Sequence, residues 1–139
     1  MSTEDRQQIE ELTNLYALHI DLFEVDEWAN VFSPNAFFDE REFGNGLYEG
    51  REAIRAYGQL LSETVQHVVH LMSNLVIRDL TATTATGIVF CLCEAEMKTG
   101  ERERNHVRYE DEYVKIDGEW KIDRRILRKT LAAEKVVVA

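Results

Sequence analysis

Histidine and carboxylate side chains are the groups of this sequence best suited to chemistry, because together they can move protons near neutral pH. The chain holds four histidines, at positions 19, 67, 70 and 106. A carboxylate bonded to one ring nitrogen fixes the tautomer of an imidazole and stabilises the imidazolium as it forms. These residues make proton transfer the first chemistry to consider.

Metal binding and covalent catalysis have little support in the motifs. His67 and His70 are three residues apart in a segment expected to be a strand, where they would face opposite sides and form a poor metal pair. The sequence contains no H-E-x-x-H, no paired C-x-x-C and no G-x-S-x-G. Cys91 and Cys93 would share a strand face, which is poor geometry for a disulfide, and neither has an evident activating base. We expect no metal site.

Three helices are expected in the first half of the chain. Ile9, Leu12, Tyr16, Ile20 and Phe23 recur at helical spacing and predict a helix over 3–23, with Leu15, Leu18 and Leu22 widening its apolar stripe. A second helix is expected over 26–32, ending before a proline, and a third over 50–61. Residues 36–39 predict a short strand between them.

Four long strands are expected in the second half. Residues 65–77, 82–98, 102–116 and 120–130 are rich in β-branched or alternating residues and are separated by turn signals such as Asp117-Gly118. Strands joined by such short turns form an antiparallel meander. With the helices preceding it, the class is α+β, with helices on one face of a strongly curved sheet.

Length and charge limit the classes of protein and partner. The 139 residues, 45% of them hydrophobic, are expected to form a single domain over 1–139. The net charge of −10 disfavours a nucleic-acid partner. No apolar run is long enough to cross a membrane and the start is too polar for a signal peptide, so we expect a cytoplasmic protein.

Local motifs, in order along nearly the whole chain, resemble the SnoaL-like group of the nuclear transport factor 2-like superfamily. They are Tyr16-Ala-Leu-His-Ile-Asp21 followed by Trp28, Gly50-Arg51-Glu52-Ala53-Ile54, His70-Leu-Met-Ser-Asn74-Leu-Val-Ile77, and Asp117-Gly118-Glu119-Trp120-Lys121-Ile122. The spacing from Tyr16 favours Asp21 as the family aspartate. Relatives often place it about four residues before the tryptophan, and Asp21 precedes Trp28 by seven, so Asp26 competes with it.

The resemblance implies a cone-shaped α+β barrel in which three N-terminal helices pack on a curved antiparallel sheet. Dehydratases and a dehydrochlorinase in this group use a histidine–aspartate pair for β-elimination without a cofactor. Our hypothesis is that His70 is the base, Asp21 orients it, and Tyr16 donates a proton toward the leaving group. Tyr16 and Asp21 lie about 140° apart around an ideal helix, so the helix must unwind or the pocket must wrap its end.

Small side chains on one face of the second long strand suggest an unfilled, apolar pocket. That face carries Ala85, Gly87, Val89, Cys91, Cys93 and Ala95. Alternation in the last strand places Arg124 beside Trp120 and Ile122, where it could pair with a carboxylate or bind substrate. The candidate substrate-binding residues are Arg124, Trp28, Met72 and Cys91. The expected ligand is a small apolar cyclic molecule of steroid, terpenoid or polyketide type.

Two other functions remain open at this point. One is a non-catalytic module, either a ligand carrier or a scaffold like the small subunit of an oxygenase. The other is a hydrolase in which Asp21 and Arg124 activate water. In each case we expect a homodimer or homotrimer, with Val107, Tyr109 and Tyr113 at the interface. The trailing 136–138 could add an edge strand to a neighbour or fray.

Overall fold

The structure is a computed structural model that describes residues 2–137, in which three α-helices and one 3-10 helix accompany seven strands. The helices are α1 (Thr3–Asp21), α2 (Val25–Asn30), η1 (Arg41–Phe43) and α3 (Arg51–Thr64). The strands are β1 (Phe32–Asp39), β2 (Leu47–Glu49), β3 (Val65–Leu80), β4 (Thr84–Met97), β5 (Arg102–Ile116), β6 (Glu119–Lys129) and β7 (Glu134–Lys135). The predicted α+β class is confirmed, and the 36–39 strand begins earlier, at Phe32.

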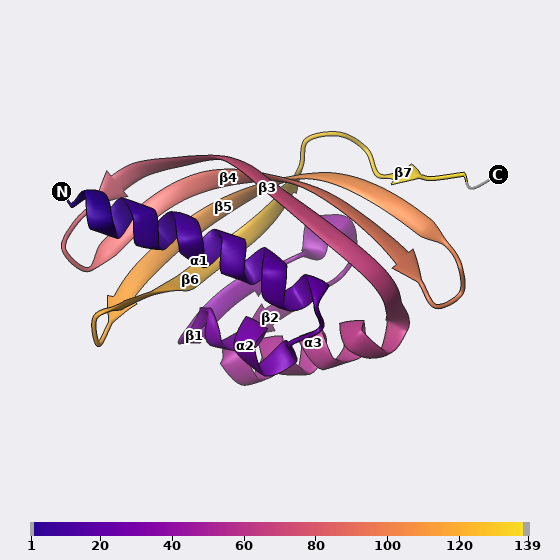
Figure 1. Cartoon of the computed structure of the whole chain (residues 1–139), viewed down its shortest axis with the longest axis horizontal. Helices are drawn as coiled ribbons and strands as arrows, with labels where there is room; N and C mark the ends of the chain where they lie inside the picture. The colour runs from indigo at the N-terminus through magenta and orange to yellow at the C-terminus, as the bar shows by residue number, and fades with distance from the viewer. Residues whose placement is uncertain (1, 138–139) are drawn as a thin grey trace.

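The strands form one sheet in the order β2-β1-β6-β5-β4-β3. β3, β4, β5 and β6 are antiparallel neighbours, as the meander predicted, while β1 pairs parallel to β6. The sheet is strongly curved and α1 lies along it beside β3, while α2 and α3 pack together near β1 (Figure 1). β3 is therefore an edge strand that faces the end of α1.

Helix α1 begins and ends where local chemistry dictates. The Ser2 hydroxyl accepts the backbone N–H of Asp5 at 3.2 Å and caps the first turn. The helix ends at Asp21, and Phe23 then adopts a positive φ of 56° that turns the chain into α2. The stripe from Ile9 to Ile20 is buried. The predicted widening of that stripe is wrong for Leu18 and Leu22, which are exposed.

A register shift in β6 overturns the predicted position of Arg124. Glu112 pairs with Arg124 but Tyr113 pairs with Ile122, so Asp123 is an extra residue that reverses the alternation of side chains. Arg124 is consequently on the outer face, 42% exposed and 3.4 Å from Glu112. Its neighbour Arg125 is fully buried instead.

Arg125 ties the sheet to α1. Its guanidinium makes two bonds of 2.8 Å to Asp111 and lies 4.4 Å from the ring centroids of both Tyr16 and Tyr109. These contacts satisfy the charge that burial would otherwise penalise. They also fix the ring of Tyr16 against the inner face of the sheet.

The outer face of the sheet differs from the predicted interface. Val107, Tyr109 and Tyr113 are buried in the core, so the prediction that they line a subunit contact is wrong. Apolar side chains are exposed on β3 and β4 instead, namely Val69, Leu71, Val76 and Phe90. The chain's own β7 pairs with β5, and Val136 donates its N–H to Arg102 at 3.1 Å. Val138 lies outside the described residues.

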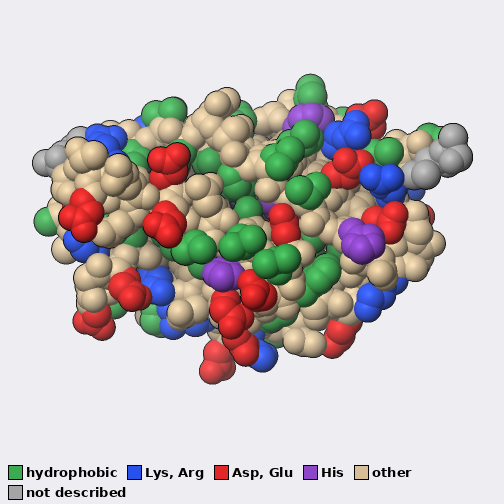
Figure 2. Space-filling model, viewed as in Figure 1, with side chains coloured by type: hydrophobic (Ala, Val, Ile, Leu, Met, Phe, Trp, Pro, Cys, Tyr) green, Lys and Arg blue, Asp and Glu red, His purple; other side chains and the backbone are tan. Residues whose placement is uncertain are grey.

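Charges on the surface follow the sequence. Residues 1–52 hold 13 acidic side chains and only three basic ones. Asp and Glu side chains gather over α2, within this range, on the face seen in Figure 2. Elsewhere on this face acidic, basic and apolar side chains are interspersed (Figure 2). None of the helices within the described range has the length and apolarity to span a membrane.

Candidate active site

His70 and Asp21 form a close, half-buried pair between β3 and the end of α1. His70 Nδ1 lies 2.6 Å from Asp21 Oδ1, and the backbone N–H of His70 donates to Asp21 Oδ2 at 2.9 Å. The side chains are 12% and 19% exposed. Because β3 is an edge strand, this amide is free to bind a side chain. Asp21 therefore fixes both the ring and the backbone of His70.

The position of Asp21 at the last turn of α1 explains how one helix supplies two site residues. Tyr16 points from the buried stripe into the molecule, whereas Asp21 reaches sideways from the helix end to β3. The two side chains therefore do not need to share a helix face. Asp26, the competing aspartate, is 72% exposed and pairs with Arg55 at the surface.

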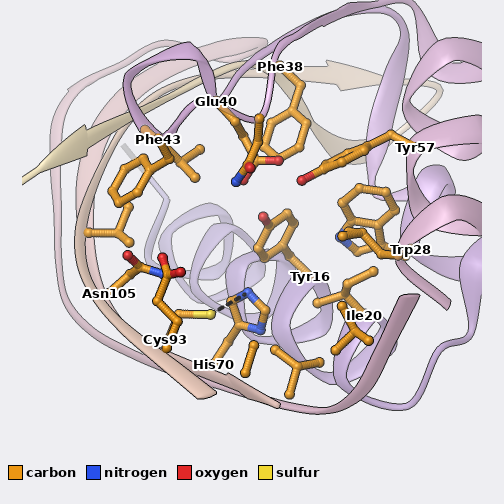
Figure 3. A pocket seen from close by; sticks show the side chains of 18 of the residues that line it. Tyr16, Ile20, Trp28, Phe38, Glu40, Phe43, Tyr57, His70, Cys93 and Asn105 are labelled. Atoms are coloured by element: carbon orange, nitrogen blue, oxygen red, sulfur yellow. Dashed lines mark hydrogen bonds between the residues drawn. The ribbon is translucent and has the colours of Figure 1, made fainter. Parts of the chain in front are cut away.

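His70 lies in the wall of a cavity of about 240 Å³ between the inner face of the sheet and the helices. Aromatic side chains form much of the wall (Figure 3), among them Tyr16, Trp28, Phe38, Phe43 and Tyr57. Exposed residues also line it, including Asn45 and Glu103, so the cavity reaches the surface at that end. The space is mostly apolar with a few polar groups, as ligand sites usually are.

Cys93 faces the second ring nitrogen of His70, with Sγ 3.5 Å from Nε2 (Figure 3). Burial raises the pKa of the Cys93 thiol, so the sulfur keeps its proton. A protonated thiol can donate only weakly, and Nε2 is its acceptor when Nδ1–H binds Asp21. This arrangement favours the tautomer with a lone pair on Nε2, on the cavity side.

Tyr16 combines a packing role with a place in the cavity wall. Its ring meets that of His70 edge-on with the centroids 6.0 Å apart, and that of Tyr109 with the centroids 5.7 Å apart. Burial raises the pKa of Tyr16 well above its usual value. A phenol that holds its proton so tightly can orient a substrate oxygen but is a poor proton donor.

Glu40 is a site residue that the sequence reasoning missed. It follows β1 directly and lines the cavity, on the same side as Tyr57 (Figure 3). Burial raises its pKa from 4.5 to about 7. The only sequence signal was an acidic pair, Asp39-Glu40, before a glycine-rich turn. Of the two, Asp39 forms an ion pair with Arg41 at 2.8 Å.

Two buried polar atoms in the cavity wall lack a hydrogen-bond partner among residues 2–137, Trp28 Nε1 and Asn105 Oδ1. Such groups are costly to leave unpaired, and both belong to residues that line the cavity. Trp28 offers a donor and Asn105 an acceptor. A ligand that satisfies both needs at least one acceptor and one donor on an otherwise apolar frame.

The remaining predicted binding residues lie elsewhere. Met72 and Cys91 pack in or against the core and do not line the cavity, while Cys93, two residues farther along β4, does. Arg124 is on the outer face, as described above. Within the described chain, no group of three His, Cys, Asp or Glu side chains is placed to hold a metal ion.

Comparison with known families agrees with this architecture. A sequence model of the SnoaL-like domain matches residues 1–126. The chain belongs to the SnoaL-like family, within the nuclear transport factor 2-like superfamily. No curated protein matches this SnoaL-like chain significantly.

Solved structures share the fold at low sequence identity. A candidate aromatic ring hydroxylase from Novosphingobium aromaticivorans is 23% identical, with a TM-score of 0.93 over 98% of this chain and 96% of that one. A candidate scytalone dehydratase from the same organism is 24% identical, with a TM-score of 0.86 over 97% and 89%. A hexachlorocyclohexane dehydrochlorinase from Novosphingobium barchaimii is 21% identical, with a TM-score of 0.81 over 96% and 90%. At these identities the likeness establishes the fold.

Proposed function

We propose that this SnoaL-like protein is a cofactor-independent lyase or isomerase in which His70 abstracts a proton from carbon, assisted by Asp21. The observation that carries the proposal is the two-point contact between Asp21 and His70 at the wall of an apolar cavity. A positioned histidine with a carboxylate behind it is a general base. Dehydratase and dehydrochlorinase neighbours with this fold are compatible with an elimination.

In the proposed reaction, Nε2 of His70 takes a proton from a carbon atom of the substrate. The electrons of the broken C–H bond form a double bond, and either a leaving group departs or a proton returns at another carbon. Asp21 stabilises the imidazolium formed during this step, because its carboxylate already binds Nδ1 at 2.6 Å. The bond from the His70 backbone N–H to Asp21 Oδ2 holds that carboxylate in place beside the ring during transfer.

The cavity supports a small, mostly apolar cyclic substrate. Its volume of about 240 Å³ lies just below the usual range of ligand sites. Within the steroid, terpenoid and polyketide-like class, this favours molecules of one or two rings. The unpartnered Trp28 N–H and Asn105 oxygen favour a substrate that carries a few oxygens.

The base assignment can be tested by proton exchange, which does not require the natural substrate. The wild-type protein should exchange the α-protons of bicyclic ketones for deuterium in D₂O, measured by NMR. His70→Ala should slow this at least about 100-fold, the usual contribution of a general base, with its melting temperature within a few degrees of wild type. His67→Ala is the matched control, because His67 is exposed and does not line the cavity.

Survival of exchange within threefold in His70→Ala would show that the base is another group. Ligand binding by a wild-type protein that exchanges no ketone proton would instead favour the non-catalytic ligand-binding module. The unfilled cavity and its unpartnered polar atoms are what favour that second function over a scaffold.

A further inference from the structure

Glu40 occupies the wall of the cavity across from the His70 pair. Figure 3 shows Glu40 and Tyr57 on one side of the space and His70 with Cys93 on the other, and the Tyr16 hydroxyl points between them. A substrate that fills the cavity would therefore have His70 at one side and Glu40 at the other.

The backbone holds Glu40 rigidly. Its N–H donates to the carbonyl of Gly46 at 2.8 Å, and its own carbonyl accepts from Phe43 at 3.0 Å and Asn45 at 3.1 Å. Gly44 and Gly46 have positive φ values of 77° and 100°, which let the chain turn sharply around these bonds. These bonds fix the backbone of Glu40, and with it the point from which the side chain enters the cavity wall.

The surroundings of Glu40 favour its protonated form. The neighbouring Asp39 is the acid that binds Arg41, so that cation is turned away from the cavity. Burial dominates and raises the pKa of Glu40 to about 7, and the nearby Tyr57 hydroxyl opposes this only in part. The titratable groups around Glu40 come from α3, β2, α1, β3, β4 and β5: Tyr57, Tyr48, Tyr16, His70, Cys93 and Glu103.

An elimination needs an acid as well as a base when the leaving group is an oxygen. The phenols of Tyr16 and Tyr57 have raised pKa values and hold their protons too tightly for this task. A carboxylic acid that titrates near neutrality matches the requirement for efficient proton donation. Glu40 is thus better suited than Tyr16, the donor expected from the sequence.

We propose that Glu40 is the proton donor to the leaving oxygen, opposite His70, and that the substrates are cyclic β-hydroxy carbonyl compounds. This inference rests on the proposed function of His70. His70 removes the α-proton, the C–H electrons form the new C=C bond, and the C–O bond breaks. The departing oxygen takes the proton of Glu40 and leaves as water. Exchange with solvent then returns a proton to Glu40 and removes one from His70.

Two probe compounds separate the acid from the base. The first is a bicyclic 3-hydroxy ketone, whose hydroxide leaves only with a proton, and the second is its 3-chloro analogue, whose chloride needs none. Glu40→Gln should slow elimination of the first about 100-fold and of the second less than about threefold. His70→Ala should slow both. Spontaneous elimination is subtracted by measuring each probe without protein.

Glu42→Gln is the matched control for Glu40→Gln. It makes the same substitution two residues away, but Glu42 is exposed, outside the cavity, and its carboxylate contacts Arg128 at 3.6 Å. Both rates should equal those of the wild type. Melting temperatures of all variants show whether the fold is kept.

The outcomes distinguish this inference from the proposed function. If His70→Ala slows both probes and Glu40→Gln slows neither, the donor role is wrong and the base assignment stands. If Glu40→Gln slows both equally, Glu40 supports the structure and is not the acid. If the wild type eliminates neither probe but still exchanges ketone protons, the donor role fails and the base assignment stands. If His70→Ala slows neither probe, the proposed function fails and the donor role with it.

A second measurement needs no substrate. Carbon-13 NMR of glutamate side-chain carboxyls should show one signal that titrates with a midpoint near 7 and is absent from Glu40→Gln. A midpoint below about 5 would overturn the donor role, because such a carboxyl is ionised at neutral pH.

Discussion

Asp21 binds His70 through both of its carboxylate oxygens, and this double contact predicts what a change of Asp21 alone will do. Asp21→Asn keeps the shape but removes the negative charge that stabilises the imidazolium. We expect its rate of ketone proton exchange to fall at least about tenfold. Asp26→Asn should leave the rate unchanged, because Asp26 only pairs with the exposed Arg55. Equal loss in both variants, or loss only in Asp26→Asn, would contradict the assignment.

Single residues were predictable where a motif named them and not where the local fold chose between neighbours. Tyr16, Asp21 and His70 stand in sequence patterns that resemble a family, and the structure brings them together. Glu40 had no such pattern. Which of the two adjacent acids turns into the cavity depends on the turn through Gly44 and Gly46 and on the ion pair between Asp39 and Arg41.

In strand β6 the sequence predicted the strand itself but not which of its side chains face inward. Turn signals such as Asp117-Gly118 predicted the meander, and both residues adopt the positive φ that a tight hairpin needs. Strict alternation then placed Arg124 inside. Because Asp123 is an extra residue in the strand, Arg125 lies inside and Arg124 outside. No alternation pattern reveals where such a bulge falls.

The bulge predicts a large difference between two adjacent ion pairs. Asp111→Asn leaves the fully buried Arg125 without its carboxylate and should lower the free energy of unfolding by about 3–5 kcal/mol. Glu112→Gln removes the partner of Arg124, where both side chains are about half exposed, and should cost less than about 1 kcal/mol. Urea denaturation of the two variants measures both. Similar losses in the two variants would mean that Arg125 is no more buried than Arg124.

The curved sheet as a whole has an inner face that encloses the cavity and an outer face that is partly apolar. Val107, Tyr109 and Tyr113 were expected outside because they share a face of β5, but curvature turns that face inward. Periodicity identifies which residues share a face, and it leaves open which face the helices cover. The exposed residues Val69, Leu71, Val76 and Phe90 of β3 and β4 are now the surface on which we propose that a homodimer or homotrimer forms.

Burial of Glu40 links the cavity to the pH dependence of the whole molecule. Its pKa is about 7 in the folded state against 4.5 ordinarily, so between these values the folded protein binds more protons than the unfolded chain. Its contribution to stability is therefore present below pH 4.5 and is lost as the pH rises through 7. Glu40→Gln carries no titrating proton at this site. Relative to this variant, the wild type should lose about 2 kcal/mol of unfolding free energy between pH 5 and pH 8.

Urea denaturation of the wild type, Glu40→Gln and Glu42→Gln at pH 5 and pH 8 measures this loss. Other titrating groups contribute equally to all three proteins and cancel in the comparison. Glu42 is exposed, so Glu42→Gln should follow the wild type at both pH values. If the difference in unfolding free energy between the wild type and Glu40→Gln is the same at pH 5 and pH 8, Glu40 has the same pKa in the folded and unfolded states. Glu40 would then be ionised at neutral pH, and an anionic wall opposite His70 would favour substrates with a positive charge over neutral ketones.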